Sequence, residues 1–513
     1  MNHVLSGLAA NTALPSELVD RLIAVADADL AGDLAGREDL SHAQAVALLA
    51  RYPETGVGLA YAGKLTASDI DPVARPDTAL ALLDEGAGGP GWARLFAADP
   101  VVERREKLAA CPGLPADVVE TLAADTNPDV VKELALWTTP ETAARLAEHP
   151  HAEVRRAVAV NVATPPDVLA ALISGEGLPP VTHCSVCERE AIPFTHDPEC
   201  SRPDCDLPAG AFCEGSHESV VHDLWVAALA NPATPADAVV RFAGHPSMLV
   251  RWTLAARPAL PPRVYRQLAA DPIPGVRSDL AENPAIGEDV MRALAGDPDP
   301  QVRQGLARNP RVPLDVLTGL ARTAKVGVTL LPRIADATPA EIRELAGSKD
   351  PAARMLAARR HDLPPGIRDA LAQDPDAKVV KSVATHPGLS EGLLRAMVER
   401  HGVRVLARVA ANPEASPALL EHLTRQARPS QKVFRAIARH RNASGEALLR
   451  CLGDREAKAW AAAHPALPPR VIVELLSDAD RRVGEAAAAN PSLPSAVMEE
   501  LVVGTGRQVV RAD

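Results

Sequence analysis

Large aromatic side chains are scarce in this sequence, with 5 Trp, 3 Tyr and 5 Phe among 513 residues. A buried aromatic ring covers a large apolar area, so a core with few rings must consist of thin layers of Ala, Leu and Val. No run of about 18 apolar residues occurs, so we expect no transmembrane helix and no membrane partner. The chain also lacks a secretory signal at its start, which predicts a cytoplasmic protein.

Proline is abundant, at 47 residues, and it cannot occupy the interior of long helices or central strands. The tract LAARPALPPRVYRQLAADPIPGVRSD begins at Leu254, and similar tracts begin at Leu280 and Leu306, a spacing of 26 residues in both cases. Weaker copies extend over most of the chain, giving about 18 repeats with a period of about 24–28 residues. A fixed period of this size predicts a stack of repeats.

Each repeat reads as two short helices. Asp299 precedes a proline and is expected to cap a helix in which Val302 and Leu306 face the core. A second helix follows, with Leu317 and Leu320 facing inward. Helices of about nine residues are unstable alone, so stacking must supply their buried surface. The sequence therefore predicts an all-α solenoid of two-helix repeats.

The recurring pattern LAxNPxLPxxVLxxLAxDPDPxVR resembles the leucine-rich repeat variant family. That resemblance implies repeats that alternate an α-helix with a 3₁₀-helix and wind into a right-handed superhelix. Many repeats here have 26 residues, against about 24 in that family, which favours two α-helices per repeat, as in HEAT-like arrays.

A cysteine-rich segment interrupts the repeats. We divide the chain into degenerate N-terminal repeats and a cap (1–107), helical repeats (108–174), the insert (175–224), and helical repeats with a C-terminal cap (225–513). Five of the 7 Cys lie in the insert, a clustering typical of a metal site in a reducing compartment. The candidate ligands are Cys184, Cys187, Cys200, Cys205 and Cys213, with His196 and His217 as alternates. Cys111 and Cys451 lie within repeats and are expected to be structural.

Two metals fit this insert. The run CDLPAGAFC followed by DLW is similar to the end of an iron–sulfur domain found in the leucine-rich repeat variant family, which implies a [4Fe–4S] cluster held by four of the five Cys. The alternative is Zn²⁺, because the first four Cys can form a tetrahedral Cys₄ site, or His196 can replace one thiolate.

Basic residues recur at one phase of the repeat. Arg155, Arg251, Arg277 and Arg303 occupy equivalent positions, which predicts a stripe on one surface; salt bridges to neighbouring repeats are the simplest explanation of it. Residues 391–450 carry 11 basic against 5 acidic side chains, a balance of +6, although the whole chain has a charge of −12. With the stripe, this region gives a candidate surface for an anionic partner that adds Arg404, Arg408, Lys432 and Arg435.

The sequence contains no arrangement of residues typical of catalysis, and we infer no small-molecule substrate. We predict a non-enzymatic scaffold that binds a protein partner through its repeats and carries a Cys-ligated metal centre. One alternative is a nucleic-acid-binding solenoid that uses the basic surface. Another is an iron–sulfur protein in redox, electron-transfer or sensing chemistry.

Overall fold

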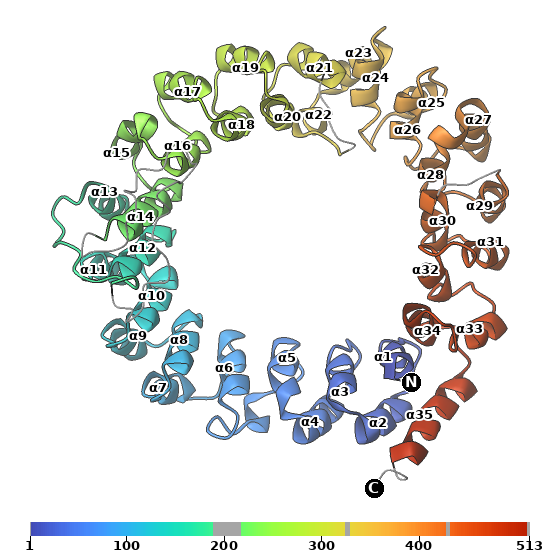
Figure 1. Ribbon diagram of the computed structural model, residues 1–513, viewed down its shortest axis with the longest axis horizontal. Helices are drawn as coiled ribbons and strands as arrows, with labels where there is room; N and C mark the ends of the chain where they lie inside the picture. Colours follow the sequence, from blue (N-terminus) through green and yellow to red (C-terminus); the bar gives the residue numbers. More distant parts are fainter. Residues whose placement is uncertain (1, 188–216, 324–328, 427–430, 510–513) are drawn as a thin grey trace, which may run out of the picture. The chain divides into compact units, whose positions relative to one another are not determined.

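A computed structural model describes residues 2–187, 217–323, 329–426 and 431–509 (Figure 1). The chain forms two compact bodies. The terminal body contains residues 1–65, 328–330 and 337–513, and the central body contains residues 66–327 and 331–336.

The terminal body contains these helices: α1 (Asn2–Ala9), α2 (Ser16–Val25), α3 (Ala28–Ala35), α4 (His42–Arg51), η1 (Pro53–Thr55), α5 (Gly56–Tyr61), α23 (Pro339–Gly347), α24 (Pro351–Ala357), α25 (Pro365–Ala372), α26 (Ala377–Val383), α27 (Glu391–His401), η4 (Gly402–Arg404), α28 (Leu406–Val409), α29 (Pro417–Thr424), α30 (Gln431–Ala438), α31 (Gly445–Cys451), α32 (Lys458–Ala462), α33 (Pro469–Leu475), α34 (Arg481–Ala488) and α35 (Ser495–Val509).

The central body contains these: η2 (Ala67–Asp69), α6 (Pro76–Asp84), α7 (Trp92–Ala97), α8 (Val102–Ala110), α9 (Ala116–Ala123), α10 (Pro128–Trp137), α11 (Pro140–Leu146), α12 (Ala152–Val160), α13 (Pro166–Ser174), α14 (Glu218–Ala230), α15 (Ala236–Val239), η3 (Val240–Gly244), α16 (Met248–Ala255), α17 (Pro262–Ala269), α18 (Pro274–Glu282), α19 (Glu288–Ala295), α20 (Pro300–Arg308), α21 (Leu314–Thr323) and α22 (Pro332–Ala335).

The two-helix repeat is confirmed. Helix α20 begins at Pro300, and the Asp299 side chain accepts a hydrogen bond from a backbone N–H of its first turn. Val302 and Leu306 are fully buried, and Leu317 of α21 is buried beside them in the second layer. Short helices therefore persist here because each buries one face against its neighbours, while proline fixes where the next helix begins.

A ladder of buried side chains joins consecutive repeats. Asn309, which follows α20, donates from Nδ2 to the carbonyls of Ala281 and Asn283 at 2.8 Å each, and those residues lie 28 and 26 positions earlier. Its Oδ1 accepts the N–H of Arg311 at 2.9 Å. Because each ladder residue holds the loop of the repeat before it, the ladder fixes the register of the stack. Other residues that donate at this position to the loop of a neighbouring repeat are Asn11, Arg37, Asn161, Asn231, Arg257, Asn283, Asn412, His440, His464 and Asn490. We call the helix before each of these residues a ladder helix.

The ladder also shows where the additional segment enters. Asn231 donates to the carbonyls of Ala159 and Asn161 at 2.9 Å, although these lie 72 and 70 residues earlier. Regular repeats show separations of 28 and 26 residues, so this repeat contains 44 more residues than a regular one. The ladder helices α12 and α14 are consequently neighbours in the stack, and the extra residues lie in the sequence between the end of α13 and the start of α14.

The two ends of the chain pack against each other within the terminal body. Helix α1 lies against α34 (Figure 1), and Asn11 donates to the carbonyls of Ala488 and Asn490 at 2.8 Å. These are the contacts that ladder residues make between consecutive repeats. The first repeat therefore follows the last one in register, an arrangement that repeat periodicity does not reveal.

The second segment of most described repeats is an α-helix, as the 26-residue spacing favours, rather than the 3₁₀-helix implied by the family resemblance. Val264 and Leu268 of α17, four residues apart and buried, illustrate the α-helical spacing of apolar positions. The described residues form no β-strand beyond one isolated bridge between His151 and His183. In this part of the chain no helix combines the length and the apolar character needed to cross a membrane.

Candidate metal centre and basic surfaces

The turn that carries Cys184 and Cys187 is attached to the first turn of α12. The Ala152 N–H donates to the His183 carbonyl at 2.9 Å, and the Ser185 N–H donates to Glu153 Oε1 at 2.8 Å. The Ser185 hydroxyl also bonds this carboxylate. Burial alone would raise the pKa of Glu153, but hydrogen bonds from His151 and Ser185 lower it to about 2. The carboxylate is therefore a fixed anchor for the turn.

His217 lies at the other end of the additional segment, where it is the N-cap of α14. Its backbone has φ 55° and ψ 18°, a left-handed conformation that is costly for a residue with a Cβ. Its side chain is buried. Because α12 and α14 are adjacent ladder helices, residues near the two ends of the additional segment meet, although 30 positions separate Cys187 from His217.

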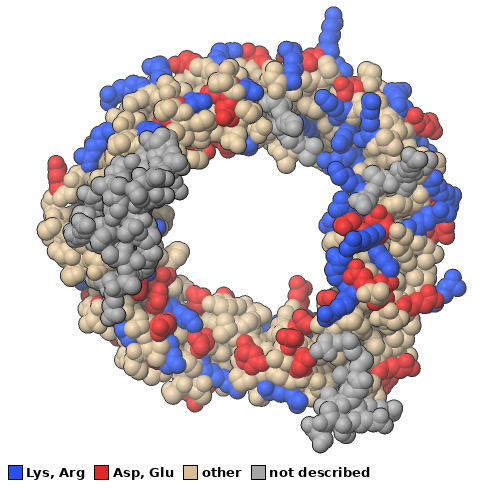
Figure 2. Space-filling view, in the orientation of Figure 1, with Lys and Arg blue, Asp and Glu red and all other residues tan. Residues whose placement is uncertain are grey.

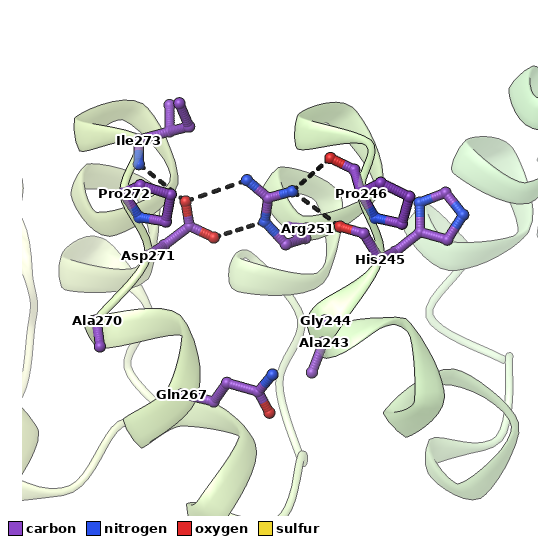
Figure 3. Close-up of a pocket in the computed structure, with 10 residues that line it drawn as sticks. All are labelled: Ala243, Gly244, His245, Pro246, Arg251, Gln267, Ala270, Asp271, Pro272 and Ile273. Carbon is purple, nitrogen blue, oxygen red and sulfur yellow. Dashed lines mark hydrogen bonds and ion pairs between the residues drawn. The ribbon is translucent and has the colours of Figure 1, made fainter. Parts of the chain in front are cut away.

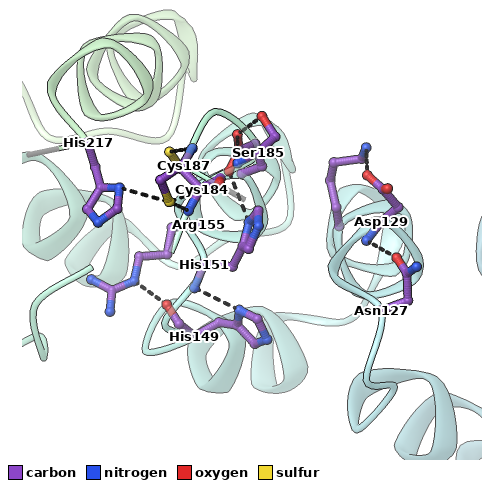
Figure 4. A network of polar contacts seen from close by, with 11 residues as sticks. Asn127, Asp129, His149, His151, Arg155, Cys184, Ser185, Cys187 and His217 are labelled. Carbon is purple, nitrogen blue, oxygen red and sulfur yellow. Dashed lines mark hydrogen bonds and ion pairs between the residues drawn. The ribbon is translucent and has the colours of Figure 1, made fainter. Parts of the chain in front are cut away.

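Three ligand atoms converge at this meeting point (Figure 4). The thiols of Cys184 and Cys187 and the ring of His217 each offer an atom, and these atoms all lie within 4.8 Å of one another. Cys187 Sγ is 3.9 Å from His217 Nδ1. A tetrahedral zinc with bonds of about 2.3 Å to sulfur and about 2.0 Å to nitrogen separates such ligands by about 3.5 Å, so a small contraction would suffice.

The turn itself suits thiolate ligands. The Cys184 N–H points at Cys187 Sγ, at 3.2 Å, and the Cys187 N–H points at Cys184 Sγ, at 3.5 Å. Backbone N–H groups directed at sulfur stabilise negative charge on it, which a metal-bound thiolate carries. Cys184 is buried with Ala152 and Val220, whereas Cys187 is exposed. The donor set and its surroundings therefore fit a metal ion with mixed sulfur and nitrogen ligands.

The remaining candidate ligands, Cys200, Cys205, Cys213 and His196, lie outside the described residues. Cys111 and Cys451 are buried within repeats, and burial raises the pKa of each thiol to about 12. Such thiols stay protonated at neutral pH and act as small apolar groups.

The arginines of the stripe bond to groups within the stack. Arg277 Nε contacts Asp297 Oδ2 at 2.8 Å, and its NH1 donates to the Asp271 carbonyl at 2.6 Å. This hydrogen bond to Asp297 raises the pKa of Arg277. Arg251 makes the same pair with Asp271, 20 residues later, at 2.6 Å.

The other two members of the stripe bond to backbone groups. Arg155 donates to the His149 carbonyl at 2.6 Å, and Arg303 donates to the Pro298 carbonyl at 3.0 Å. The guanidinium groups of all four stripe arginines thus bond to groups of this chain, which leaves them poorly placed to contact a partner.

The second group of basic candidates is different. Arg404 and Lys432 are exposed, and Arg408 and Arg435 are half-buried. None of the four makes an ion pair with any residue that the structure describes. They therefore remain available to an anionic partner.

A cleft of about 670 Å³ lies between repeats of the central body (Figure 3). Its charged groups, Arg251 and Asp271, bond to each other, and Arg251 also donates to the carbonyls of His245 and Pro246 at 2.8 and 2.7 Å. These lining residues therefore satisfy one another, and the cleft supplies no charge for a ligand.

No established protein family and no curated protein matches this chain. One solved structure, described as an engineered protein, is similar over 95% of this chain and 98% of its own length, with 17% identity and a TM-score of 0.12. A likeness at that score supports no statement about fold or function.

Several residues around these sites were not among the sequence candidates. Glu153 and Ser185 anchor the Cys turn, and nothing in their spacing distinguishes them. Lys378, Lys381 and Arg439 lie with the second basic group, and counting back from the ladder residue of each repeat would have found them.

Proposed function

We propose that this protein is a non-enzymatic, right-handed α-solenoid scaffold with a structural zinc centre at the junction of α12 and α14. The observation that carries the proposal is the convergence of Cys184, Cys187 and His217 from the two ends of the additional segment. A zinc ion there would tie both ends of that segment to the repeat stack and contribute its binding energy to folding. A tetrahedral structural site needs a fourth ligand, for which Cys200, Cys205, Cys213 and His196 are the candidates.

The donor chemistry favours zinc over the [4Fe–4S] cluster. Such clusters are held by four thiolates, whereas an imidazole nitrogen is one of the three converging atoms here. Imidazole is a common zinc ligand in Cys₃His and Cys₂His₂ sites. The binding of a protein partner rests on the repeat architecture, because stacked repeats present extended surfaces for that purpose.

Elemental analysis of the full chain, purified without oxygen or chelators, tests the metal centre. We expect about one zinc per chain. After replacement by Co²⁺, the visible spectrum should show tetrahedral cobalt with sulfur-to-metal charge transfer. About four irons per chain would replace this proposal by the iron–sulfur alternative, and a metal-free protein that also fails to take up Zn²⁺ or Co²⁺ would refute both.

Matched cysteine variants locate the site. Cys184→Ser and Cys187→Ser should each abolish stoichiometric zinc, and His217→Ala should weaken binding by about 10-fold or more. Cys451→Ala, at a buried repeat cysteine, should retain the metal. Retention of zinc in Cys184→Ser would contradict the assignment. Far-ultraviolet circular dichroism should stay near that of the parent chain, because the repeats stack independently of the additional segment.

A further inference from the structure

Three consecutive ladder helices of the terminal body carry basic side chains on one face. Asn412 and His440 are the ladder residues that follow α28 and α30. Asn412 donates to the His386 carbonyl at 2.8 Å, so His386 occupies the same position in the repeat before, and we count α26, which precedes it, as a ladder helix. We count positions back from each of these three residues. The positions one, four, five and eight residues earlier lie on one face of a helix, because residues three or four apart are neighbours on its surface. Seven of these twelve positions are basic and none is acidic; the basic residues are Lys378, Lys381, Arg404, Arg408, Lys432, Arg435 and Arg439.

These cations point away from the core. The positions seven, six and three before the ladder residue hold the buried side chains, for example Val379, Val380 and Val383 of α26. The basic positions lie on the other side of the same helices. Lys378, Lys381, Arg404, Lys432 and Arg439 are exposed. Figure 2 shows Lys and Arg side chains gathered over these helices.

The same face of other repeats is not basic. In the repeat that ends at Asn283, the equivalent positions hold Gly275, Ser278, Asp279 and Glu282. Apart from Arg439, the seven cations make no ion pair, hydrogen bond or ring contact with the described residues. The arginine stripe lies six residues before the ladder residue, where Arg155 and Arg251 are buried and Arg277 and Arg303 are half-buried, and its side chains bond within the stack. The basic face is therefore a local feature, and its charges are not needed to hold the repeats together.

An aromatic ring adjoins this face. Trp460 of α32, the next ladder helix, is 49% exposed, and the guanidinium of Arg439 lies 4.5 Å from its ring centroid. Trp460 lies four residues before its ladder residue, His464, which is the position of Arg408 in its own repeat. A half-exposed indole beside a row of unpaired cations offers a stacking surface for a base as well as charge for phosphates.

We propose that the face formed by α26, η4, α28, α30 and Trp460 binds single-stranded nucleic acid. The cations recur with each repeat, as the phosphates of a nucleic-acid backbone recur along the strand. The indole of Trp460 can stack on an unpaired base, which favours a single strand over an acidic peptide or a closed duplex. The face lies in the terminal body, whereas the proposed zinc centre lies in the central body, so the two proposals stand separately.

Fluorescence anisotropy with a labelled 20-nucleotide oligo-dT tests the proposal on the full chain. If about six cations contact phosphates, the affinity should fall roughly 300-fold between 50 and 200 mM salt. A duplex of equal length and poly-glutamate should compete weakly. Absence of binding at 50 mM salt, or equal competition by poly-glutamate or the duplex, would overturn the proposal.

Two sets of variants separate charge from stacking. Replacing Lys378, Arg404 and Lys432 together by Ala should weaken binding and reduce the slope of log affinity against log salt by about 2. Trp460→Ala should lower the affinity about 10-fold and leave that slope unchanged.

A matched control replaces three exposed arginines of the central body, Arg94, Arg145 and Arg266, by Ala, with the same change in net charge. This control should bind like the parent chain. Equal loss in both triple variants, or an unaffected Trp460→Ala variant, would refute the assigned face. Cys184→Ser, which tests the zinc centre, should bind oligo-dT normally.

Discussion

The ladder makes a sharp energetic prediction at Asn309, which is fully buried. Asn309→Ala removes two hydrogen bonds to carbonyls, at 2.8 Å each, and one from the Arg311 N–H at 2.9 Å. Each buried backbone group left without a partner costs about 1–3 kcal/mol. Because some of these groups will find water, we expect a total loss of about 3–5 kcal/mol.

Substitutions of Asn309 by His and by Asp should destabilise the ladder to different degrees. At an equivalent position His464 donates from Nε2 to the His440 carbonyl at 3.0 Å and accepts the Ala466 N–H on Nδ1 at 3.1 Å. Asn309→His therefore retains one donated and one accepted bond and should cost about 1 kcal/mol. Asn309→Asp should cost at least as much as Ala, since it places a negative charge against two carbonyls.

Native-state hydrogen exchange is the appropriate assay, because repeat arrays open locally and a single unfolding free energy is poorly defined for them. In Asn309→Ala the amides of α20 and α21 should exchange about 100-fold faster or more, whereas those of α10 should be unchanged. Gln301→Ala, an exposed change in the same helix, serves as the control. A loss below about 1 kcal/mol for Ala, or equal losses for Ala and His, would refute the reasoning.

Three further predictions concern other contacts. Arg277→Met should cost about 3 kcal/mol, because it leaves a nearly buried carboxylate unpaired, and Asp297→Asn should recover part of this in a double-mutant cycle; strict additivity would count against the pair. His386→Asn should flatten the decline in stability at low pH. Burial lowers the pKa of this histidine to about 4, so as the pH falls below 6.5 the unfolded chain takes up a proton that the folded chain does not. The parent chain should lose about 2 kcal/mol from this group between pH 7 and pH 5, measured by denaturation midpoints, and an unchanged profile in the variant would exclude the effect. Gly7→Ala should separate the packed chain ends, because the new Cβ would lie 2.1 Å from a backbone oxygen of α34. Exchange in α1 should then rise, whereas Gly32→Ala, with open space around it, should have no such effect.

Much of the repeat was predictable because its signals are local. Proline and Asp-Pro steps fix where helices begin, and the spacing of Val302 and Leu306 fixes which face is buried. The same local signals placed Cys184 and Cys187 in one turn. They gave His217 only as an alternate ligand alongside His196, because its place beside the thiols follows from the packing of α12 against α14.

The sequence by itself determined the helical repeat, its period, the clustered cysteines and the basic balance of residues 391–450, because these are properties of neighbouring residues. The tertiary structure decided which charged side chains pair within the stack and which stay exposed to solvent. Arg277 lies six residues before its ladder residue and pairs with a carboxylate of the next repeat. Lys432 lies eight residues before its own ladder residue and is exposed to solvent. The tertiary structure also placed Asn11 against the last repeat. Such outcomes depend on which distant backbone groups lie opposite each side chain, and only the packed stack brings those groups together.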